Sequence, residues 1–140
     1  MKIETYLTFP GTAEAAMAFY AKVFDTKVTD LQRMGDMPGM PPMSDETAQM
    51  IGHARINVQG RLIMASDAAE QFSGPHKGFH GFNLSAQCDT VEEAKELFAK
   101  LAEGGEVTMA LDKTFWAAAF GMCRDKFGVG WMVNCDAEGN

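Results

Sequence analysis

Two segments of the chain repeat one another, and this repeat constrains the fold more than any other feature. Residues 12–23 read TAEAAMAFYAKV and residues 90–101 read TVEEAKELFAKL, so Thr, Glu, Ala, a pair of large apolar residues and Ala-Lys recur in register at an offset of 78 residues. Each segment opens with a Thr that can cap a helix and continues with apolar residues at helical spacing. Two unrelated amphipathic helices can also look alike, so the flanking segments decide between a repeat and a coincidence.

The flanking segments match as well. In each half, one β-like segment precedes the helix and three follow it, which predicts strands at residues 2–9, 27–34, 50–58 and 61–67 and again at 79–87, 105–112, 116–124 and 129–136. We therefore predict an α+β fold of two βαβββ modules, with the helices outside and a cup-shaped mixed sheet around a cavity. We expect one domain, residues 1–140, made of repeats at about 1–70 and 79–138 and a linker at 71–78.

The first half carries an additional Met- and Pro-rich segment, residues 35–48, which Pro and Gly should keep out of regular structure. Four methionines recur at every third position from the residue just before this segment: Met34, Met37, Met40 and Met43. Thioethers at this spacing could bind Cu(I), but a flexible apolar lid over the cavity is the better interpretation. The same segment could also form an interface or an inert loop.

Strand alternation assigns side chains to the two faces of each sheet. On strand 50–58, the polar set His53, Arg55 and Asn57 shares a face with Ile51 and should point into the cavity. A two-residue turn at Gln59-Gly60 then pairs Arg55 with Met64 and His53 with Ser66. Arg55 could clamp a ligand carboxylate or phosphate while His53 exchanges a proton, or Arg55 could simply bridge to an acidic neighbour.

The last hairpin can be interpreted in the same way. A three-residue loop at 126–128 pairs Met122 with Met132 and Phe120 with Asn134. Trp116, Phe120, Met122 and Arg124 then face inward, whereas Ala117, Ala119, Gly121 and Cys123 lie under the helix. Trp131 falls on the helix-facing side and should belong to the core, and Trp116 could either stack on a planar ligand or fill the core.

Composition excludes several functional classes. The net charge is −7 and the basic residues are scattered, which argues against nucleic acid and against an anionic membrane surface. Cys88, Cys123 and Cys135 are an odd number without metal-type spacing, so we expect buried, reduced thiols. The chain opens with a strand-like pattern and has no long apolar run, and we predict a cytoplasmic protein.

The repeat, Ala18-Phe19-Tyr20 and the hairpin RDKFGVGW at 124–131 resemble the vicinal oxygen chelate superfamily, which includes glyoxalase I, fosfomycin-resistance enzymes, extradiol dioxygenases and bleomycin-resistance proteins. GDMP at 35–38, TFWA at 114–117 and DKFGV at 125–129 are similar to its PhnB-like branch, some members of which are labelled 3-demethylubiquinone methyltransferase. The resemblance implies a glyoxalase-like fold, a homodimer and a small-molecule ligand.

Enzymes of the superfamily usually hold a divalent metal with His, Glu or Gln from the first and last strands of each module. By register the resemblance places these positions at Thr5, Met64, Asn83 and Met132, none of which is a strong ligand for Zn²⁺, Mg²⁺ or Mn²⁺. We therefore predict no metal site and no cofactor, and keep open a divalent metal held by other ligands such as His53.

The predicted function is the binding of a small, partly apolar, anionic molecule. The predicted ligand-binding residues are Thr5, His53, Arg55, Met64, Asn83, Trp116, Phe120, Met122 and Met132. The alternative is an enzyme of lyase, dioxygenase or transferase type, metal-dependent or metal-free, with His53 as the candidate catalytic residue; a protein-interaction module is a third possibility.

Two further motifs carry little weight. A methyltransferase finds no support, because Gly104-Gly105 ends a helix, whereas a methyl-donor site usually needs a glycine-rich turn that opens one. His76 and His80 flank a Gly- and Pro-containing linker in which no helix is expected, and we interpret both as solvated.

Overall fold

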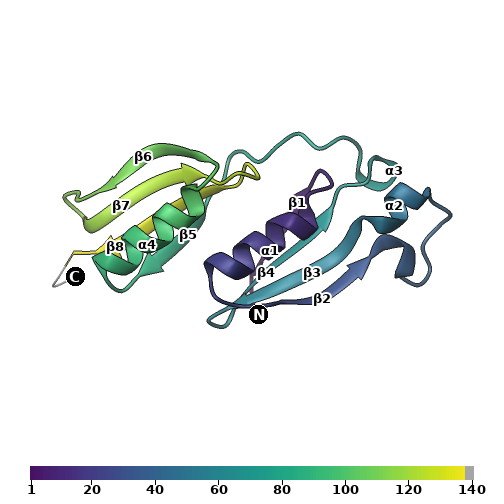
Figure 1. Cartoon of the computed structure of the whole chain (residues 1–140), viewed down its shortest axis with the longest axis horizontal. Helices are drawn as coiled ribbons and strands as arrows, with labels where there is room; N and C mark the ends of the chain where they lie inside the picture. Colours follow the sequence, from purple (N-terminus) through teal and green to yellow (C-terminus); the bar gives the residue numbers. More distant parts are fainter. Residues whose placement is uncertain (138–140) are drawn as a thin grey trace. The chain divides into compact units, whose positions relative to one another are not determined.

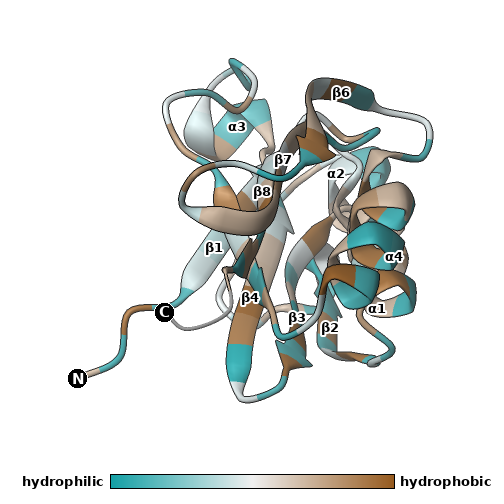
Figure 2. Cartoon of the chain, turned by 90° about the vertical axis from the view of Figure 1, so that its left-hand side faces the viewer, coloured by the Kyte–Doolittle hydropathy of each residue, from teal (hydrophilic) through white to brown (hydrophobic). Residues whose placement is uncertain are grey.

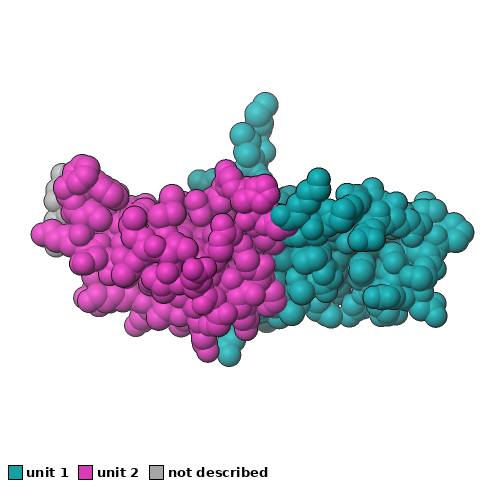
Figure 3. Space-filling model, turned by 90° about the horizontal axis from the view of Figure 1, so that it is seen from above, with its two compact units in different colours: residues 1–77 teal, residues 78–140 magenta. Residues whose placement is uncertain are grey.

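The structure, a computed structural model, describes residues 1–137. The chain divides into two compact units, Met1–Lys77 and Gly78–Asn140, which are coloured separately in Figure 3. The boundary falls next to the end of the expected linker 71–78. That the two units form one domain around a shared cavity stays a prediction.

The first unit is a four-stranded sheet covered on one face by a helix (Figure 1). Its elements are β1 (Thr5–Phe9), α1 (Ala13–Val23), β2 (Val28–Arg33), the 3-10 turn η1 (Met34–Asp36), α2 (Asp45–Gln49), β3 (Ile51–Val58), β4 (Arg61–Asp67) and α3 (Glu70–Ser73). The strand order is β1-β4-β3-β2, with β1 parallel to β4 and the other pairs antiparallel.

The second unit repeats this topology. Its elements are β5 (Leu84–Cys88), α4 (Val91–Ala102), β6 (Glu106–Asp112), β7 (Ala117–Arg124) and β8 (Gly130–Asp136). The strand order β5-β8-β7-β6 matches that of the first unit, and β5 is parallel to β8. The predicted α+β class with two βαβββ modules is confirmed, and each predicted strand is present, although residues 2–4 and 79–83 lie outside β1 and β5.

Each helix buries apolar residues against its own sheet, and Figure 2 shows apolar and polar residues on different sides of α4. Met17 and Tyr20 of α1 are buried over the first sheet, as are Phe98 and Leu101 of α4 over the second. Gly121 of β7 makes the second contact possible, because a Cβ there would lie about 3.0 Å from the Phe98 ring and the Leu111 backbone. The small residues of β7 are therefore packing residues.

The two helices begin differently. The Thr90 hydroxyl accepts the Glu93 amide at 3.1 Å, as a capping Thr should. Thr12 makes no such bond, so the prediction for this residue is wrong. In its place the buried carboxylate of Asp67, at the end of β4, accepts the amides of Ala13 and Ile51, each at 2.9 Å. A single carboxylate thus ties α1, β3 and β4 together.

The segment 35–48 is more regular than predicted. It contains part of η1 and most of the helix α2, whose first turn is capped by the Ser44 hydroxyl accepting the Thr47 amide at 3.1 Å. Met34 is buried, and the Met37 thioether occupies the space over Gly52 where a side chain would otherwise lie. At least the start of this segment is thus packed against the beginning of β3, and a lid formed by the rest stays a prediction.

The register of both hairpins is as predicted. Gln59 and Gly60 have φ of 50° and 90°, the left-handed values of a two-residue turn, and Arg55 pairs with Met64. In the second unit Met122 pairs with Met132 and Phe120 with Asn134. The three-residue loop is closed by the Asp125 amide donating to the Val129 carbonyl at 2.9 Å.

Asp125 organises this loop. Its buried carboxylate accepts the Phe127 amide at 2.8 Å, the Val129 amide at 3.1 Å and the Trp131 indole N–H at 2.8 Å. Trp131 is 3% exposed and pairs with Cys123, which confirms it as a core residue. The Asp-Lys-Phe-Gly sequence is therefore a folding element.

Candidate ligand-binding site

Each sheet has a helix-facing side and a side turned away from its helix, which we call the open face. On the open face of the first unit, Tyr6, Arg55 and Met64 lie side by side, because Met64 pairs with Tyr6 on one flank and with Arg55 on the other. All three side chains are half-buried or exposed, whereas the residues that alternate with them are mostly buried. The predicted polar residues of β3, His53, Arg55 and Asn57, therefore lie on the open face. Ile51, which the alternation predicts on the same face, does not.

Ile51 departs from the predicted alternation. Arg33 pairs with Ile51 and Gln32 with His53, so β3 carries an extra residue at Gly52. Arg33 forms an ion pair with Glu14 of α1, and its partner Ile51 is 1% exposed. The bulge thus turns Ile51 into the core and leaves His53 and Arg55 on the open face.

Tyr6 and His53 form a polar pair on this face. The phenol oxygen of Tyr6 lies 3.3 Å from Nδ1 of His53, and the ring centroids are 5.8 Å apart. The phenol O–H can donate a hydrogen bond to Nδ1 of the neutral imidazole, which leaves Nε2 available to a ligand. This pair can hold or move one proton at a ligand lying against the sheet.

Arg55 is already paired. Its guanidinium lies 2.6 Å from the carboxylate of Asp30, and both side chains are about half exposed. Asp30 occupies a bulge in β2, between the pairs Thr29–Arg55 and Gln32–His53, and has a φ of 53°. The sequence left two roles open for Arg55, a ligand clamp and a bridge to an acidic neighbour. The structure contains the bridge. An anion at Arg55 must therefore share or displace Asp30.

The second unit has an aromatic and thioether open face. Trp116 contacts Phe120 at 5.4 Å and Phe115 at 4.8 Å between ring centroids, with both pairs edge to face. Trp116 is 45% exposed, which favours stacking on a ligand over a core role. Met122 and Met132 continue the same face on β7 and β8.

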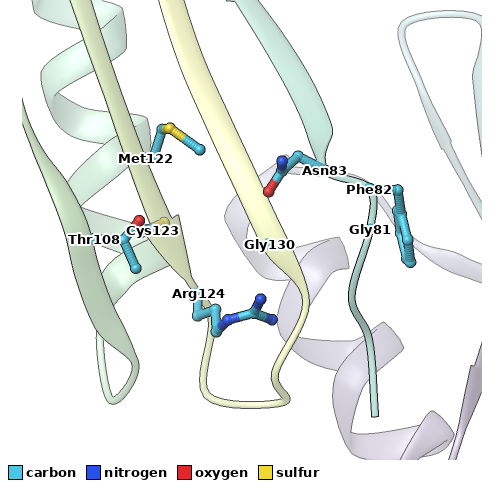
Figure 4. Close-up of a pocket in the computed structure, with 8 residues that line it drawn as sticks. All are labelled: Gly81, Phe82, Asn83, Thr108, Met122, Cys123, Arg124 and Gly130. Carbon is cyan, nitrogen blue, oxygen red and sulfur yellow. The ribbon is translucent and has the colours of Figure 1, made fainter. Parts of the chain in front are cut away.

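A pocket of about 230 Å³ opens in the second unit (Figure 4). It is lined by Gly81, Phe82, Asn83, Thr108, Met122, Cys123, Arg124 and Gly130. The Arg124 guanidinium donates through one nitrogen to the Gly128 carbonyl at 2.7 Å and the Phe79 carbonyl at 3.0 Å. The sequence pattern predicts Asn83 and Met122 in the site and turns Arg124 inward, but it does not indicate Thr108 or Phe82.

Thr108 could not have been found by alternation. Val107 pairs with Cys123 and Met109 with Met122, so Thr108 is an unpaired residue in a bulge of β6. Phe82 precedes β5, in a segment that the sequence pattern assigns to that strand.

The structure corrects which residues of β1 and β5 lie on the open face. Thr5 shares its side of β1 with the core residues Leu7 and Phe9, and the open-face residue is Tyr6. The register pairs Tyr6 with Met64 and Ser85 with Met132, so these two pairs are equivalent in the repeat. Asn83 precedes β5 and reaches the pocket instead.

A divalent metal does not fit these positions. The corrected pairs are Tyr6 with Met64 in the first unit and Ser85 with Met132 in the second, and neither a phenol, a hydroxyl nor a thioether is a preferred ligand of Zn²⁺, Mg²⁺ or Mn²⁺. Within residues 1–137, no three His, Cys, Asp or Glu side chains are grouped so that they could hold a metal ion. The donor chemistry thus differs from that of the metal enzymes of the superfamily.

The cysteines are buried and free. Burial raises the pKa of Cys88 to about 11, with the nearby Glu93 carboxylate adding to the effect. Burial also raises the pKa of Cys123 to about 11, with Asp125 contributing. Both thiols are therefore protonated at neutral pH and are poor nucleophiles.

The linker histidines differ from one another. His76 is half-buried, with Nε2 2.7 Å from the Thr8 carbonyl, so the prediction of a solvated residue is wrong. His80 is exposed, as predicted. In the described part of the chain, no helix is both long enough and apolar enough to cross a membrane.

Comparison with known proteins identifies relatives over nearly the whole chain. Residues 1–134 match the model of the family described as 3-demethylubiquinone-9 3-methyltransferase. Protein YjdN of Escherichia coli is 34% identical over 96% of this chain and 95% of its own length. The crystal structure of PA1353 from Pseudomonas aeruginosa is 40% identical, with a TM-score of 0.88 and coverage of 97% of this chain and 98% of that one.

The fold extends to more distant proteins. The PhnB protein of Bacillus cereus is 29% identical, with a TM-score of 0.76 and coverage of 96% and 99% of the two chains. A glyoxylase/bleomycin resistance protein/dioxygenase domain from Frankia has a TM-score of 0.70 at 16% identity, covers 100% and 94%, and shares the fold alone. The chain therefore belongs to the 3-demethylubiquinone-9 3-methyltransferase family, is similar to a PhnB protein, and shares its fold with a glyoxylase/bleomycin resistance protein/dioxygenase domain.

Proposed function

We propose that this chain binds a small, partly apolar, anionic molecule through the open faces of its sheets and the pocket of the second unit, without a divalent metal. The observation that carries the proposal is the make-up of these surfaces. They combine a phenol–imidazole pair, two arginines and exposed aromatic rings, while the positions used for metal in the superfamily carry Met64 and Met132. A few oriented polar groups within an apolar lining are typical of small-molecule sites.

The predicted residues His53, Arg55, Met64, Asn83, Trp116, Phe120, Met122 and Met132 remain the proposed contacts. Tyr6 replaces Thr5 in this set, because it is the β1 residue beside Met64 on the open face. A ligand that lies across Tyr6 and Met64 meets one hydrogen-bonding group and one thioether, which suits a partly apolar molecule.

Calorimetric titration tests the proposal. Protein purified without chelator is titrated with aromatic and aliphatic carboxylates, phosphonates and their neutral amides, before and after dialysis against EDTA. We expect an anionic compound to bind with an affinity that EDTA treatment leaves unchanged. A stoichiometric metal in the purified protein that His53→Ala removes, together with binding that depends on it, contradicts the metal-free proposal.

A second candidate is a metal-free enzyme that uses His53. The observation that favours it is the 3.3 Å contact between the Tyr6 phenol and His53 Nδ1, which can orient the imidazole for general acid–base work. Exchange of ligand C–H protons with solvent deuterium, followed by NMR, provides the test. We expect exchange in the wild-type protein and its loss in His53→Gln, whereas equal exchange in the two proteins excludes this role.

The family's label also suggests a methyltransferase. Gly104 has a φ of 74° just beyond the end of α4, so the Gly-Gly pair terminates a helix instead of opening one. We therefore give this activity less weight than ligand binding. Titration with S-adenosylmethionine checks this assessment: no heat of binding is expected, and saturable binding restores the methyltransferase proposal.

The assembly and the location of the protein are also proposals. We propose a homodimer in the cytoplasm, for which Val107 and Met109 on the edge strand β6, each about half exposed, give apolar surface for a partner copy. Light scattering of the purified protein tests the stoichiometry, since a single species at the monomer mass contradicts the dimer. Fractionation of the source cells tests the location.

A further inference from the structure

The two arginines of the open faces, Arg55 and Arg124, differ in the groups that bind their guanidinium. Arg55 lies in an ion pair with Asp30. Arg124 is held by two neutral backbone carbonyls, those of Phe79 and Gly128, both of which accept from the same guanidinium nitrogen. Among residues 1–137, no carboxylate forms an ion pair with Arg124. Arg124 is therefore held in one orientation by neutral groups, without an ion-pair partner among these residues.

Arg124 also lines the pocket of the second unit. Figure 4 shows the Asn83 amide and the Arg124 guanidinium on either side of the Gly130 end of β8. Gly130 leaves room for the Asn83 amide in this position, because a Cβ there would meet the Asn83 side-chain oxygen. Thr108, in its bulge, adds a hydroxyl from the β6 side of the same pocket. Polar side chains from three different parts of the unit thus line this one pocket.

The remaining walls are apolar. Met122 lies on the β7 side, and Phe82, which is 45% exposed and stacks edge to face on Phe79, borders the pocket opposite it. The volume of about 230 Å³ is below the roughly 300–1,000 Å³ of sites for drug-sized ligands. It therefore suits one ring or one short chain with its charged group.

We propose that the Arg124 pocket is the anion subsite of this protein, where a carboxylate, phosphonate or phosphate group accepts from Arg124, Asn83 and Thr108 while its substituent lies against Met122 and Phe82. The inference rests on the proposed function and names the subsite and the ligand class within it. Charge-assisted hydrogen bonds to a guanidinium are the strongest available in such a site. The guanidinium N–H groups that do not bind Phe79 and Gly128 provide the donors.

One neighbouring carboxylate opposes anion binding. Glu106 is the cross-strand partner of Arg124, is exposed, and forms no ion pair with it. Side chains of paired residues lie on the same side of a sheet, so Glu106 acts on an anion at Arg124 by like-charge repulsion. Removing this charge should therefore strengthen anion binding, a result that no loss of structure can mimic.

The test uses phenylphosphonate, benzoate and inorganic phosphate as probes, with benzamide as a neutral analogue, titrated by calorimetry at low ionic strength. In the full chain we expect Arg124→Gln to weaken phenylphosphonate binding by roughly tenfold or more and Thr108→Val by about threefold. Glu106→Gln should strengthen it by about twofold to fivefold. Lys95→Gln, an exposed charge on α4, controls for net charge and should leave the Kd unchanged.

Arg124→Gln also removes the bonds to Phe79 and Gly128, so its thermal unfolding and circular dichroism are recorded. If it is unfolded, Thr108→Val and Glu106→Gln alone decide the matter, and unchanged Kd values in both overturn the subsite. Loss of binding in Arg55→Gln, with full affinity in Arg124→Gln, overturns the Arg124 subsite and leaves the proposed function intact. Binding of benzamide as tight as that of benzoate overturns both the subsite and the anionic ligand class.

Discussion

The two units share a topology, but they place their charges differently. On equivalent strands, the first unit carries His53 and Arg55 where the second carries Phe120 and Met122, since Arg55 pairs with Met64 and Met122 with Met132. The edge strand β2 has a bulge between Thr29 and Gln32, and β6 has the equivalent bulge between Met109 and Asp112. Only the bulge of β2 contains an acidic residue, Asp30. The same backbone thus supports a neutralised ion pair in one unit and an apolar face in the other.

The buried carboxylates show the same divergence. Asp67 joins the end of β4 to the first turn of α1 in the first unit, whereas Asp125 closes the β7–β8 hairpin in the second. The second helix has no need of the first solution, because Thr90 caps it locally. Each unit therefore uses one buried acid to accept backbone amides that its helices and strands leave unpaired.

Removing the Asp125 carboxylate tests this difference most severely. Asp125→Ala removes the carboxylate that accepts two backbone amides and the Trp131 indole N–H, and we expect a loss of about 3–5 kcal/mol in the free energy of unfolding. Urea unfolding measures it. The exposed Asp112→Ala is the matched control and should change stability by less than about 0.5 kcal/mol. An equal effect of the two variants contradicts the role of Asp125.

Alkaline pH provides the next comparison, because all three cysteines lie in the second unit. Folding raises the pKa of Cys88 and of Cys123 from 9.0 to about 11, so the folded state favours the protonated thiols. Their contribution is complete below pH 9 and is lost between about pH 9 and 11, by up to about 2 kcal/mol for each thiol.

Urea midpoints at pH 8 and pH 10.5 measure this loss. The Cys88→Ala/Cys123→Ala double variant should show a smaller fall between the two pH values than the wild-type protein does. An identical fall in the two proteins assigns the alkaline sensitivity to other groups.

The helix caps offer a smaller effect. Thr90→Ala removes the acceptor of the Glu93 amide and should cost about 1 kcal/mol, whereas Thr12→Ala removes no cap and should cost only a few tenths. Thermal or urea unfolding of the two variants measures the difference directly. Equal losses show that the two helices begin in the same way in solution.

The Arg55–Asp30 pair should have the smallest effect on stability. Both side chains are about half exposed, so Arg55→Gln and Asp30→Asn should each change the free energy of unfolding by less than about 1 kcal/mol. A double-mutant cycle gives the coupling energy, which should fall further when salt is added. A coupling of several kcal/mol instead identifies the pair as part of the folded core of the unit.

Much of the fold was predictable because strand alternation and helical spacing are local. The repeat, the eight strands, the register of Arg55 with Met64 and of Met122 with Met132, and the burial of Trp131 follow from periodicity and turn length. The residues that β1 and β5 place on the open face could not be predicted in this way. The β1–α1 connection is one residue longer than the β5–α4 connection, so the 78-residue offset of the helices does not hold for the first strands, where the equivalent residues Tyr6 and Ser85 are 79 apart and Thr5 lies on the opposite face.

The amino-acid pattern alone is enough to establish that two βαβββ modules form and which residues can serve on their open faces, because both depend on side-chain periodicity along one element. Which of the charged residues have an oppositely charged partner is a property of the folded chain. Asp30 reaches Arg55 through a bulge, and Arg124 binds the carbonyl of Phe79, 45 residues away. Such pairings depend on which strands become neighbours and where their ladders are interrupted, and neither is written in the local pattern.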